Sequence, residues 1–379
     1  MGNYSLESPE TSEKPLNDAI AGESPNPGDP PFQAAIPDPY LLRCLELARI
    51  AGAAVEPNPR VGAVMVHQGR IIGEGAHAFL GGPHAEVNAI RSVQNPDLLP
   101  ESTLYVSLEP CNHHGTTPPC TNLILEKRIP HVVVGDVDPN PQMSGRSIAF
   151  LRACGVRVEV CEDEGPFRAL NRHFWVNQRE GRPYVTLKWA ESADGLIAGM
   201  RGDGQPDPRP ISCREANRLL HSLRHESQAI CIGKNTALID DPSLTTRHWP
   251  GRDPVRIVFD QNLELPRSLR IFQKGSWIVI NSKLDQVEGD GRFWKVADSR
   301  DLRALLSRLY SECKIGSILV EGGRNLSQQF LDAGIWDEVV RCVSPVNLHS
   351  GVKAPRLKGG LVPTESLRVG TDLMEQYFR

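Results

Sequence analysis

The sequence predicts an α/β protein in which two folded domains follow an N-terminal tail. Helical and strand-like patterns alternate in both halves of the chain, as is typical of α/β folds. The chain has 379 residues, enough for two to three domains at roughly 150 residues each. A polar stretch with turn-forming residues at 178–183 separates the two halves. We therefore expect one domain at 40–180 and another at 181–379.

Composition distinguishes the tail at residues 1–39 from the rest of the chain. It holds eight of the 31 prolines, and its single lysine stands against seven acidic residues. A segment of this kind cannot bury enough apolar surface to offset the entropy lost on ordering. The sequence therefore predicts a disordered acidic tail.

Charge and cysteine content limit the classes of function. The chain carries 42 Lys and Arg against 46 Asp and Glu, a formal net charge of −4, and it has no basic block. This argues against a nucleic-acid or membrane partner and favours small-molecule substrates. Nine scattered cysteines do not suit a disulfide scaffold, and no apolar leader is visible. We therefore expect a cytoplasmic protein.

In the first domain, a helix is expected from Tyr40, where apolar residues recur at helical spacing. Strands and helices then alternate. The expected order is a strand over 61–66 entering a hairpin at Gly69, a helix after Pro83, a strand over 103–108, a helix over 121–127, a strand over 131–135 and a helix–strand pair over 147–160.

In the second domain the same alternation returns, and the two halves do not look like copies of each other. The expected strands cover 184–189, 229–232, 255–259, 277–280 and 317–320, and the expected helices cover 213–224, 301–310 and 325–333.

The strongest chemical signal is a set of zinc ligands in the first domain: His84, Cys111 and Cys120. Two thiolates and one imidazole leave a fourth position of a tetrahedral zinc ion open to water, as in catalytic sites. Glu86, two residues after the histidine, can face that position without ligating and move protons. The H-x-E and P-C…C pattern is that of zinc nucleobase deaminases. A structural zinc site completed by His113 or His114, or ordinary buried cysteines, would be the alternative.

Further runs narrow the class of deaminase. They are PNPRVG at 57–62, GEG at 73–75 with His77, LEPCNHHGTTPPC at 108–120 and DPNP at 138–141. With these runs the chain resembles the bifunctional riboflavin-biosynthesis deaminase/reductase family. Other nucleobase deaminases usually have two residues between the cysteines, whereas here there are eight.

The resemblance implies a cytidine-deaminase-like three-layer domain. Its substrate would be a diamino-pyrimidinone with a ribosylamino 5′-phosphate, whose 2-amino group is replaced by oxygen. Asn58, His77 and the loop between the zinc cysteines would line the pyrimidine site. From the residues alone, Asn58 could equally be a turn residue, and His77 an exposed or internally bonded histidine.

The second domain carries a glycine pair, Gly322-Gly323, between a predicted strand and a predicted helix. Such a turn exposes backbone N–H groups that bind phosphate, although a plain tight turn would look the same. No G-x-G-x-x-G pattern follows a strand, which argues against a standard Rossmann domain.

This half resembles the reductase domain of the same family through the runs PYVTLK at 183–188, AESADG at 190–195, SLR at 222–224, TALIDDPSLTTR at 236–247 and VEGG at 320–323. The resemblance implies a dihydrofolate-reductase-like α/β domain that uses NADPH to reduce the ring-opened ribose to a ribityl chain. The residues it implies are Ala190, Thr236, Asp240 and Gly323 for the coenzyme, and Arg224, Leu244, Arg247 and Glu321 for the substrate.

Two arginines in that set, Arg224 and Arg247, could clamp a phosphate bidentately. Lys188 and Asp194 are candidates for polarising or protonating the sugar carbonyl, with a surface salt bridge as the alternative. Two stretches depart from the family's pattern. Residues 199–210 are rich in Gly and Pro, with Pro210 where a Trp often stands, and residues 346–351 read VNLHSG.

The sequence thus predicts a bifunctional enzyme that deaminates and then reduces its substrate, using Zn²⁺ and NADPH. A deaminase of the same pathway with a weak reductase domain is the main alternative. A zinc-stabilised binding protein would have no use for Glu86, and the lack of a basic patch makes a tRNA or DNA deaminase a poor fit. The resemblance also suggests a homo-oligomer.

Overall fold

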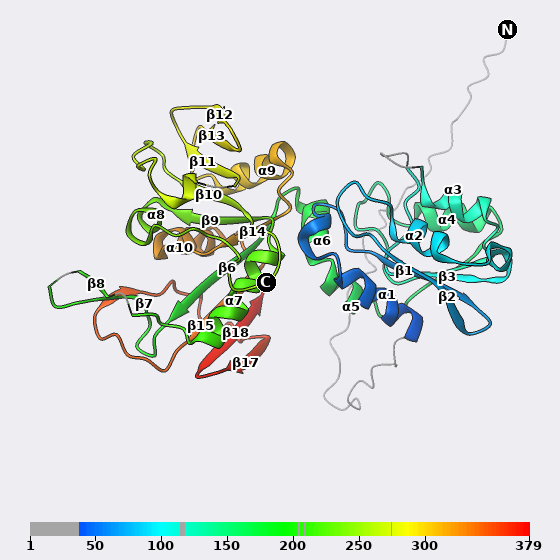
Figure 1. Ribbon diagram of the computed structural model, residues 1–379, viewed down its shortest axis with the longest axis horizontal. Coiled ribbons are helices and arrows are strands. Elements are labelled where there is room, and N and C mark those ends of the chain that lie inside the picture. The colour runs from blue at the N-terminus through cyan, green and yellow to red at the C-terminus, as the bar shows by residue number, and fades with distance from the viewer. Residues whose placement is uncertain (1–37, 114–117, 204, 208, 274) are drawn as a thin grey trace, which may run out of the picture. The chain divides into compact units, whose positions relative to one another are not determined.

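A computed structural model describes residues 38–113, 118–203, 205–207, 209–273 and 275–379 (Figure 1). The predicted tail therefore lies outside the described residues except for its last two positions, and so does His114. Among the helices of the described part, none has the length and apolar character needed to cross a bilayer.

The first half of the chain forms a five-stranded sheet in the order β2-β1-β3-β4-β5. Strand β1 pairs antiparallel with β2 and β3, whereas β3, β4 and β5 are parallel. The strands are β1 (Gly62–His67), β2 (Arg70–Ala76), β3 (Thr103–Val106), β4 (His131–Val134) and β5 (Arg157–Val160).

Helices cover both faces of this sheet and create three layers (Figure 1). The helices are α1 (Pro39–Arg49), α2 (Ala85–Ser92), α3 (Cys120–Glu126), α4 (Arg146–Ala153) and α5 (Gly165–Leu170), with short 3-10 turns at Gly52–Val55 and Pro96–Glu101. Met65 and Val132 pack with α2, α3 and α4 on one face. Val64 and Val133 pack on the other face with α1 and α5, because successive strand side chains point to opposite sides.

The second half forms a ten-stranded sheet in the order β12-β13-β11-β10-β9-β14-β6-β15-β18-β17, preceded by α6 (Arg172–Glu180). The run from β13 to β15 is parallel, and β12, β18 and β17 are antiparallel to their neighbours. The strands are β6 (Tyr184–Glu191), β9 (Ala229–Gly233), β10 (Val255–Phe259), β11 (Trp277–Asn281), β12 (Gln286–Glu288), β13 (Gly291–Lys295), β14 (Ser317–Val320), β15 (Glu338–Val343), β17 (Glu365–Val369) and β18 (Asp372–Phe378).

Helices also cover both faces of the second sheet. They are α7 (Arg214–Glu226), α8 (Lys234–Asp240), α9 (Leu302–Cys313) and α10 (Arg324–Ala333). Ile257 packs in the core beneath α9 and α10, and its neighbour Val258 packs on the opposite face with α8. The carboxyl ends of the parallel strands meet at one edge, which is where α/β sheets place their ligands.

A separate three-stranded sheet is formed by β7 (Leu196–Met200), β8 (Pro206–Asp207) and β16 (Gly351–Lys353), in the order β16-β7-β8. It joins the two stretches in which the sequence departs from the family's pattern. The sequence did not predict this sheet, nor α8, β12, β13, β15, β17 and β18. Residues 178–180 belong to the end of α6, so only the remainder of the polar stretch is a turn.

Candidate zinc centre and reductase site

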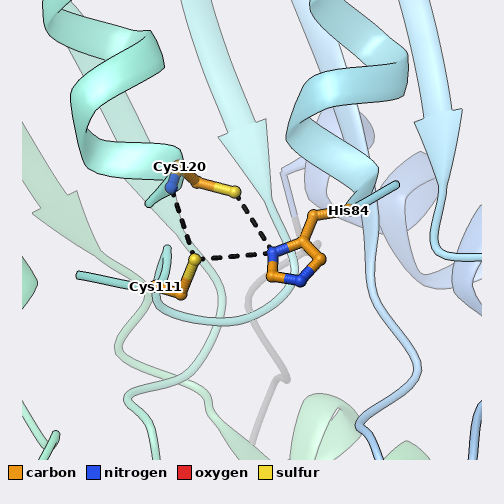
Figure 2. A group of neighbouring side chains, drawn as sticks. All are labelled: His84, Cys111 and Cys120. Carbon is orange, nitrogen blue, oxygen red and sulfur yellow. Dashed lines mark hydrogen bonds between the residues drawn. The ribbon is translucent and has the colours of Figure 1, made fainter. Parts of the chain in front are cut away.

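The two helices that pack on one face of the first sheet bring the predicted zinc ligands together. His84 is the residue that precedes α2, and Cys120 is the first residue of α3. Cys111 lies in the loop that follows β3, and its carbonyl accepts a hydrogen bond from Thr121 N (3.3 Å). Residues separated by up to 36 positions in the chain therefore meet at the starts of two neighbouring helices (Figure 2).

The three donor atoms suit a tetrahedral metal ion. His84 Nδ1 lies 3.4 Å from Cys111 Sγ and 3.3 Å from Cys120 Sγ, and all three atoms fall within 4.8 Å of one another. Two ligands of a tetrahedral zinc ion are separated by roughly 3.5 Å when the Zn–N and Zn–S bonds have their usual lengths. Hydrogen bonds from Cys120 and His84 hold the pKa of the Cys111 thiol well below its usual value, although burial opposes this shift. The donor set and its spacing therefore fit zinc.

Glu86 lies beside this group and is almost fully buried, with 4% of its surface exposed. Burial and the negative charge of Cys111 raise the pKa of its carboxyl to about 7. A carboxyl group in such a place exchanges protons near neutral pH, which is what a general acid–base requires. Glu86 is not one of the three residues whose donor atoms converge, so its predicted role in proton transfer stays a prediction.

His77 and Asn58 are also brought to this centre. The His77 ring meets the His84 ring edge-on, with 5.5 Å between the ring centres. His77 Nδ1 donates to the Pro83 carbonyl (3.0 Å), and its Nε2 accepts from Asn58 Nδ2 (3.4 Å). Burial lowers the pKa of this imidazole, so the ring is held neutral in one tautomer. The structure therefore places both residues beside the predicted zinc ligands, and their role in binding a pyrimidine stays a prediction.

In the second half, a cavity of about 1040 Å³ follows the carboxyl ends of the parallel strands. Six predicted site residues line it: Lys188, Ala190, Thr236, Asp240, Glu321 and Gly323. A second cavity of about 330 Å³ is lined by Arg224, Leu244 and Arg247, and Asp240 lines both. The predicted coenzyme and substrate residues thus gather around two cavities that share a carboxylate.

Glu321 is the centre of a charge network at this site. Its carboxylate accepts two hydrogen bonds from Arg224, each 2.7 Å long, and lies 3.7 Å from Lys188 Nζ. Burial opposes ionisation, yet Lys188 and Arg224 together lower the pKa of Glu321 to about 2. The carboxylate is therefore ionised at neutral pH and holds the lysine ammonium group at the cavity wall.

Arg224 makes contacts within the protein that the predicted phosphate clamp did not include. Its Nη1 donates to the Thr245 carbonyl (2.8 Å), so three of the five N–H donors of its guanidinium group are used within the protein. Arg247 is exposed, and its one hydrogen bond within the described part of the chain is a long contact of 3.5 Å with Ser243. Both arginines line the smaller cavity, and Arg247 has more donors free for an anion than Arg224 has.

Asp194 does not line either cavity. Its carboxylate accepts hydrogen bonds from Ser192 Oγ (2.6 Å) and from the backbone N–H groups of Leu348 (3.1 Å) and His349 (2.7 Å). The first of these contacts is the main reason that the pKa of Asp194 falls to about 2. The structure therefore gives Asp194 the task of fastening two loops rather than a place beside the reacting atoms.

Comparison with known proteins assigns the chain to a family. Residues 38–136 match the cytidine and deoxycytidylate deaminase zinc-binding region, and residues 183–370 match the RibD C-terminal domain. The riboflavin biosynthesis protein RibD of Aquifex aeolicus is 38% identical over 322 residues, which cover 83% of this chain and 88% of the relative. The chain belongs to the RibD family. It is thus a riboflavin-biosynthesis enzyme that joins a deaminase domain to a reductase domain.

Solved structures of RibD proteins support the same assignment. A diaminohydroxyphosphoribosylaminopyrimidine deaminase/5-amino-6-(5-phosphoribosylamino)uracil reductase from Thermotoga maritima superimposes with a TM-score of 0.80 at 34% identity, covering 89% of this chain and 97% of that chain. RibD from Acinetobacter baumannii (form 2) gives a TM-score of 0.79 at 29% identity, with the same coverage. The predicted fold class, a deaminase-like α/β domain followed by a reductase α/β domain, is confirmed.

Two residues that support the RibD zinc centre were missed by the sequence analysis. Asn88 on α2 donates to the carbonyls of Ala76 (2.9 Å) and Pro83 (3.4 Å), which fixes the segment that carries His77 and His84. Glu109 is buried and accepts hydrogen bonds from Ser147 Oγ (2.6 Å) and from several backbone N–H groups around the start of α4. Glu109 stands two residues before Cys111 in the sequence, and this position beside a predicted zinc ligand could have identified it.

The two stretches of the second half that depart from the family's pattern are paired with each other in the structure. Gly199 of β7 pairs with Gly351 of β16, so the unusual loop at 199–210 is tied to the unusual loop at 346–351. Gly351 has φ of +152°, and a Cβ atom there would approach the Ala198 carbonyl oxygen to 1.9 Å. Pro210 lines the large cavity at the position where a Trp was expected.

Proposed function

We propose that the first domain of this RibD protein, residues 40–180, removes the 2-amino group of 2,5-diamino-6-ribosylamino-4(3H)-pyrimidinone 5′-phosphate. The main support for this proposal is that His84, Cys111 and Cys120 converge beside the buried Glu86. The solved relative from Thermotoga maritima bears the name of this deaminase and of the matching reductase. Water adds to the pyrimidine carbon and ammonia leaves, so an amine is replaced by oxygen.

His84, Cys111 and Cys120 would hold the zinc ion. Zinc, when bound, acts as a Lewis acid and makes water a nucleophile near neutral pH. Glu86 takes a proton from the attacking water and returns it to the departing amine. Asn58 and His77 orient the pyrimidine ring, since their amide and imidazole groups lie beside the ligand group and are held by hydrogen bonds.

We propose further that the second domain, residues 181–379, uses NADPH to reduce 5-amino-6-(5-phosphoribosylamino)uracil. Hydride adds to the carbonyl carbon of the opened sugar, and a proton adds to its oxygen. Lys188 is the group that supplies this proton or polarises the carbonyl, because Glu321 holds its ammonium at the cavity wall. Ala190, Thr236, Asp240 and the turn at Gly323 contact the coenzyme.

The smaller cavity is the proposed place for the substrate phosphate. Arg247 binds the anion there, while Leu244 shapes the wall. Arg224 acts through Glu321 as a positioning residue, a role that its two hydrogen bonds to the Glu321 carboxylate support. Asp194 keeps the loop after β6 in place for the same site.

Mass spectrometry of the products tests both halves. The zinc-loaded protein is incubated with the diamino-pyrimidinone ribosylamino phosphate, with and without NADPH. Exchange of amine for oxygen in both samples, and two added hydrogens only with NADPH, is the expected result. Exchange without reduction would favour a deaminase with a weak second domain, and an unchanged substrate would contradict the proposed pyrimidine. The Glu86→Gln variant serves as the control, since it should keep its zinc and release no ammonia.

The proposed substrates and coenzyme are small molecules, and neither nucleic acid nor a membrane takes part in the proposed reactions. We expect the protein to work in the cytoplasm as a homo-oligomer. Size-exclusion chromatography with light scattering would measure the number of chains, and a mass equal to one chain would contradict this expectation.

A further inference from the structure

The large cavity of the second domain extends over the ends of several strands in a fixed order. Lys188 stands on β6, Glu321 follows the neighbouring β14, and Gly233 ends β9, the next strand in the sheet. Beyond them, Asn262 follows β10, and Arg300 lies in the segment after β13. Neighbouring strands are about 4.8 Å apart, so the lining residues span several strand widths.

Together with the proposed reductase function, this order of strands indicates how a bound dinucleotide would lie along the cavity. Hydride transfer takes place beside Lys188 and Glu321, at the β6 end of the cavity. Asp240 lines both cavities, which places it on the substrate side as well. The Gly322–Gly323 turn at the start of α10 provides backbone N–H groups for the diphosphate. The adenosine half must then extend over β9 and β10 towards Ser299 and Arg300.

The cationic side chains near the adenosine end of the cavity differ in whether another side chain already binds them. The ammonium of Lys234 is paired with the Glu264 carboxylate, which also accepts from Asn262 Nδ2. Arg300 is exposed, lines the cavity, and has no ion pair within the described residues. The nearby Asp298 carboxylate accepts the backbone N–H of Arg300 (2.9 Å) and so fixes its main chain.

Among the described residues that line this end of the cavity, none is an Asp or Glu, and the nearby Glu264 carboxylate is paired with Lys234. Sites for NAD commonly place an Asp or Glu at a strand end to accept the ribose 2′-hydroxyl, and NADP sites place an Arg there. Asp260, directly after β10, is buried and accepts the Leu265 N–H (2.9 Å), and it does not line the cavity. The lining residues after β10 are instead the neutral amides Gln261 and Asn262.

We propose that Arg300, assisted by the Ser299 hydroxyl, binds the phosphate on the adenosine ribose and makes this reductase prefer NADPH to NADH. The guanidinium group offers a planar pair of donors that match a phosphate. Asp301 does not compete for Arg300, because its carboxylate accepts the Ala304 N–H (3.0 Å) at the start of α9.

Calorimetric titration with 2′,5′-ADP and with 5′-AMP measures this contact without any reaction. The whole zinc-loaded protein should bind 2′,5′-ADP roughly 10- to 100-fold more tightly than 5′-AMP, as expected for charge-assisted hydrogen bonds to one phosphate. In Arg300→Gln this preference should nearly vanish. Arg303→Gln is the matched control, because Arg303 is an exposed arginine three residues further on that does not line the cavity. It should behave as the wild type.

Steady-state reduction gives the second measurement. The ratio of kcat/KM with NADPH to kcat/KM with NADH should fall about 10- to 100-fold in Arg300→Gln. An unchanged preference for 2′,5′-ADP in Arg300→Gln, or equal binding of the two probes by the wild type, would overturn the inference. If the wild type reduces the substrate with neither coenzyme but shows the Arg300-dependent preference, the proposed reductase function fails while the phosphate site stands.

Discussion

The zinc centre and the reductase cavity are assembled in different ways within one chain. At the zinc centre, the ligands and the acid come from two short runs of sequence, and each ligand stands at the start of a helix or in the loop between. At the reductase cavity, the lining comes from the ends of β6, β9, β10 and β14 and from the segment after β13. The first site depends on local spacing, and the second depends on the order of strands in a sheet.

Because the two sites are built differently, we expect the two activities to respond differently to single substitutions. A concentrated site fails when one of its few groups is altered, because no neighbouring group can replace it. A distributed site divides binding among many contacts, and most single changes there should weaken affinity rather than abolish reaction. We therefore expect the largest loss of activity for a substitution at the zinc centre.

The largest effect is expected for Glu86→Gln. Loss of the proton shuttle should lower the rate of ammonia release about 10³- to 10⁴-fold, while zinc content stays the same. Reduction of separately supplied deaminated substrate should remain at the wild-type rate. Zinc is measured by atomic emission and ammonia by a coupled assay. Retained ammonia release would remove Glu86 from the mechanism.

Glu321→Gln should have the next largest effect. The change keeps the side-chain volume but leaves Lys188 and Arg224 without their buried counter-charge. Breaking such a pair costs about 3 kcal/mol of unfolding free energy, and reduction should slow about 100-fold. Deamination should be unaffected. Glu312→Gln, which breaks only the exposed pair with Arg308, should cost less than about 1 kcal/mol in urea unfolding.

Gly351→Ala tests whether the small sheet supports the cavity. The added methyl group would collide with the Ala198 carbonyl and separate β16 from β7, whose Gly199 lines the cavity. We expect the KM for the coenzyme to rise about 3- to 10-fold, which corresponds to roughly 1 kcal/mol, with ammonia release unchanged. Gly202→Ala is the control, because a Cβ atom there meets open space. Equal coenzyme KM values for the two variants would show that the sheet does not shape the site.

A further prediction concerns acid stability rather than activity. Burial, with help from the charges of Arg224 and Arg247, lowers the pKa of His221 from 6.5 to about 4. Between these values the unfolded chain binds a proton that the folded protein does not, so the free energy of unfolding falls as the pH drops from about 6.5 to about 4. His221→Gln should flatten this slope in urea titrations at pH 7 and pH 5. The same slope in both proteins would contradict the assignment.

The sequence predicted the zinc centre almost completely, and the reductase site less so, for a physical reason. His84, Glu86, Cys111 and Cys120 form a recognisable pattern because their chemistry requires a fixed local spacing. Support from Asn88 was not predicted, since an asparagine inside a helix carries no such pattern.

In the second half, the sequence identified residues that line the cavity but not how they pair. Arg224 was assigned to a phosphate, yet it binds Glu321, which is 97 residues away in the chain. Asp194 likewise binds backbone groups 154 and 155 residues away. Such pairings depend on which strands become neighbours. The three-stranded sheet was missed for the same reason, because its strands are short and join distant loops.

The network of Lys188, Glu321 and Arg224 also constrains how this protein can diverge. A substitution that removes the charge of Glu321 leaves Lys188 and Arg224 without their counter-charge, and selection removes most chains that carry such a defect. A viable replacement therefore requires coordinated changes at two or three positions that lie on three different elements, β6, α7 and the turn after β14. Among descendants of this gene, we expect these positions to covary as a set, and Arg247, which makes no contact with this network among the described residues, to be constrained by its ligand instead.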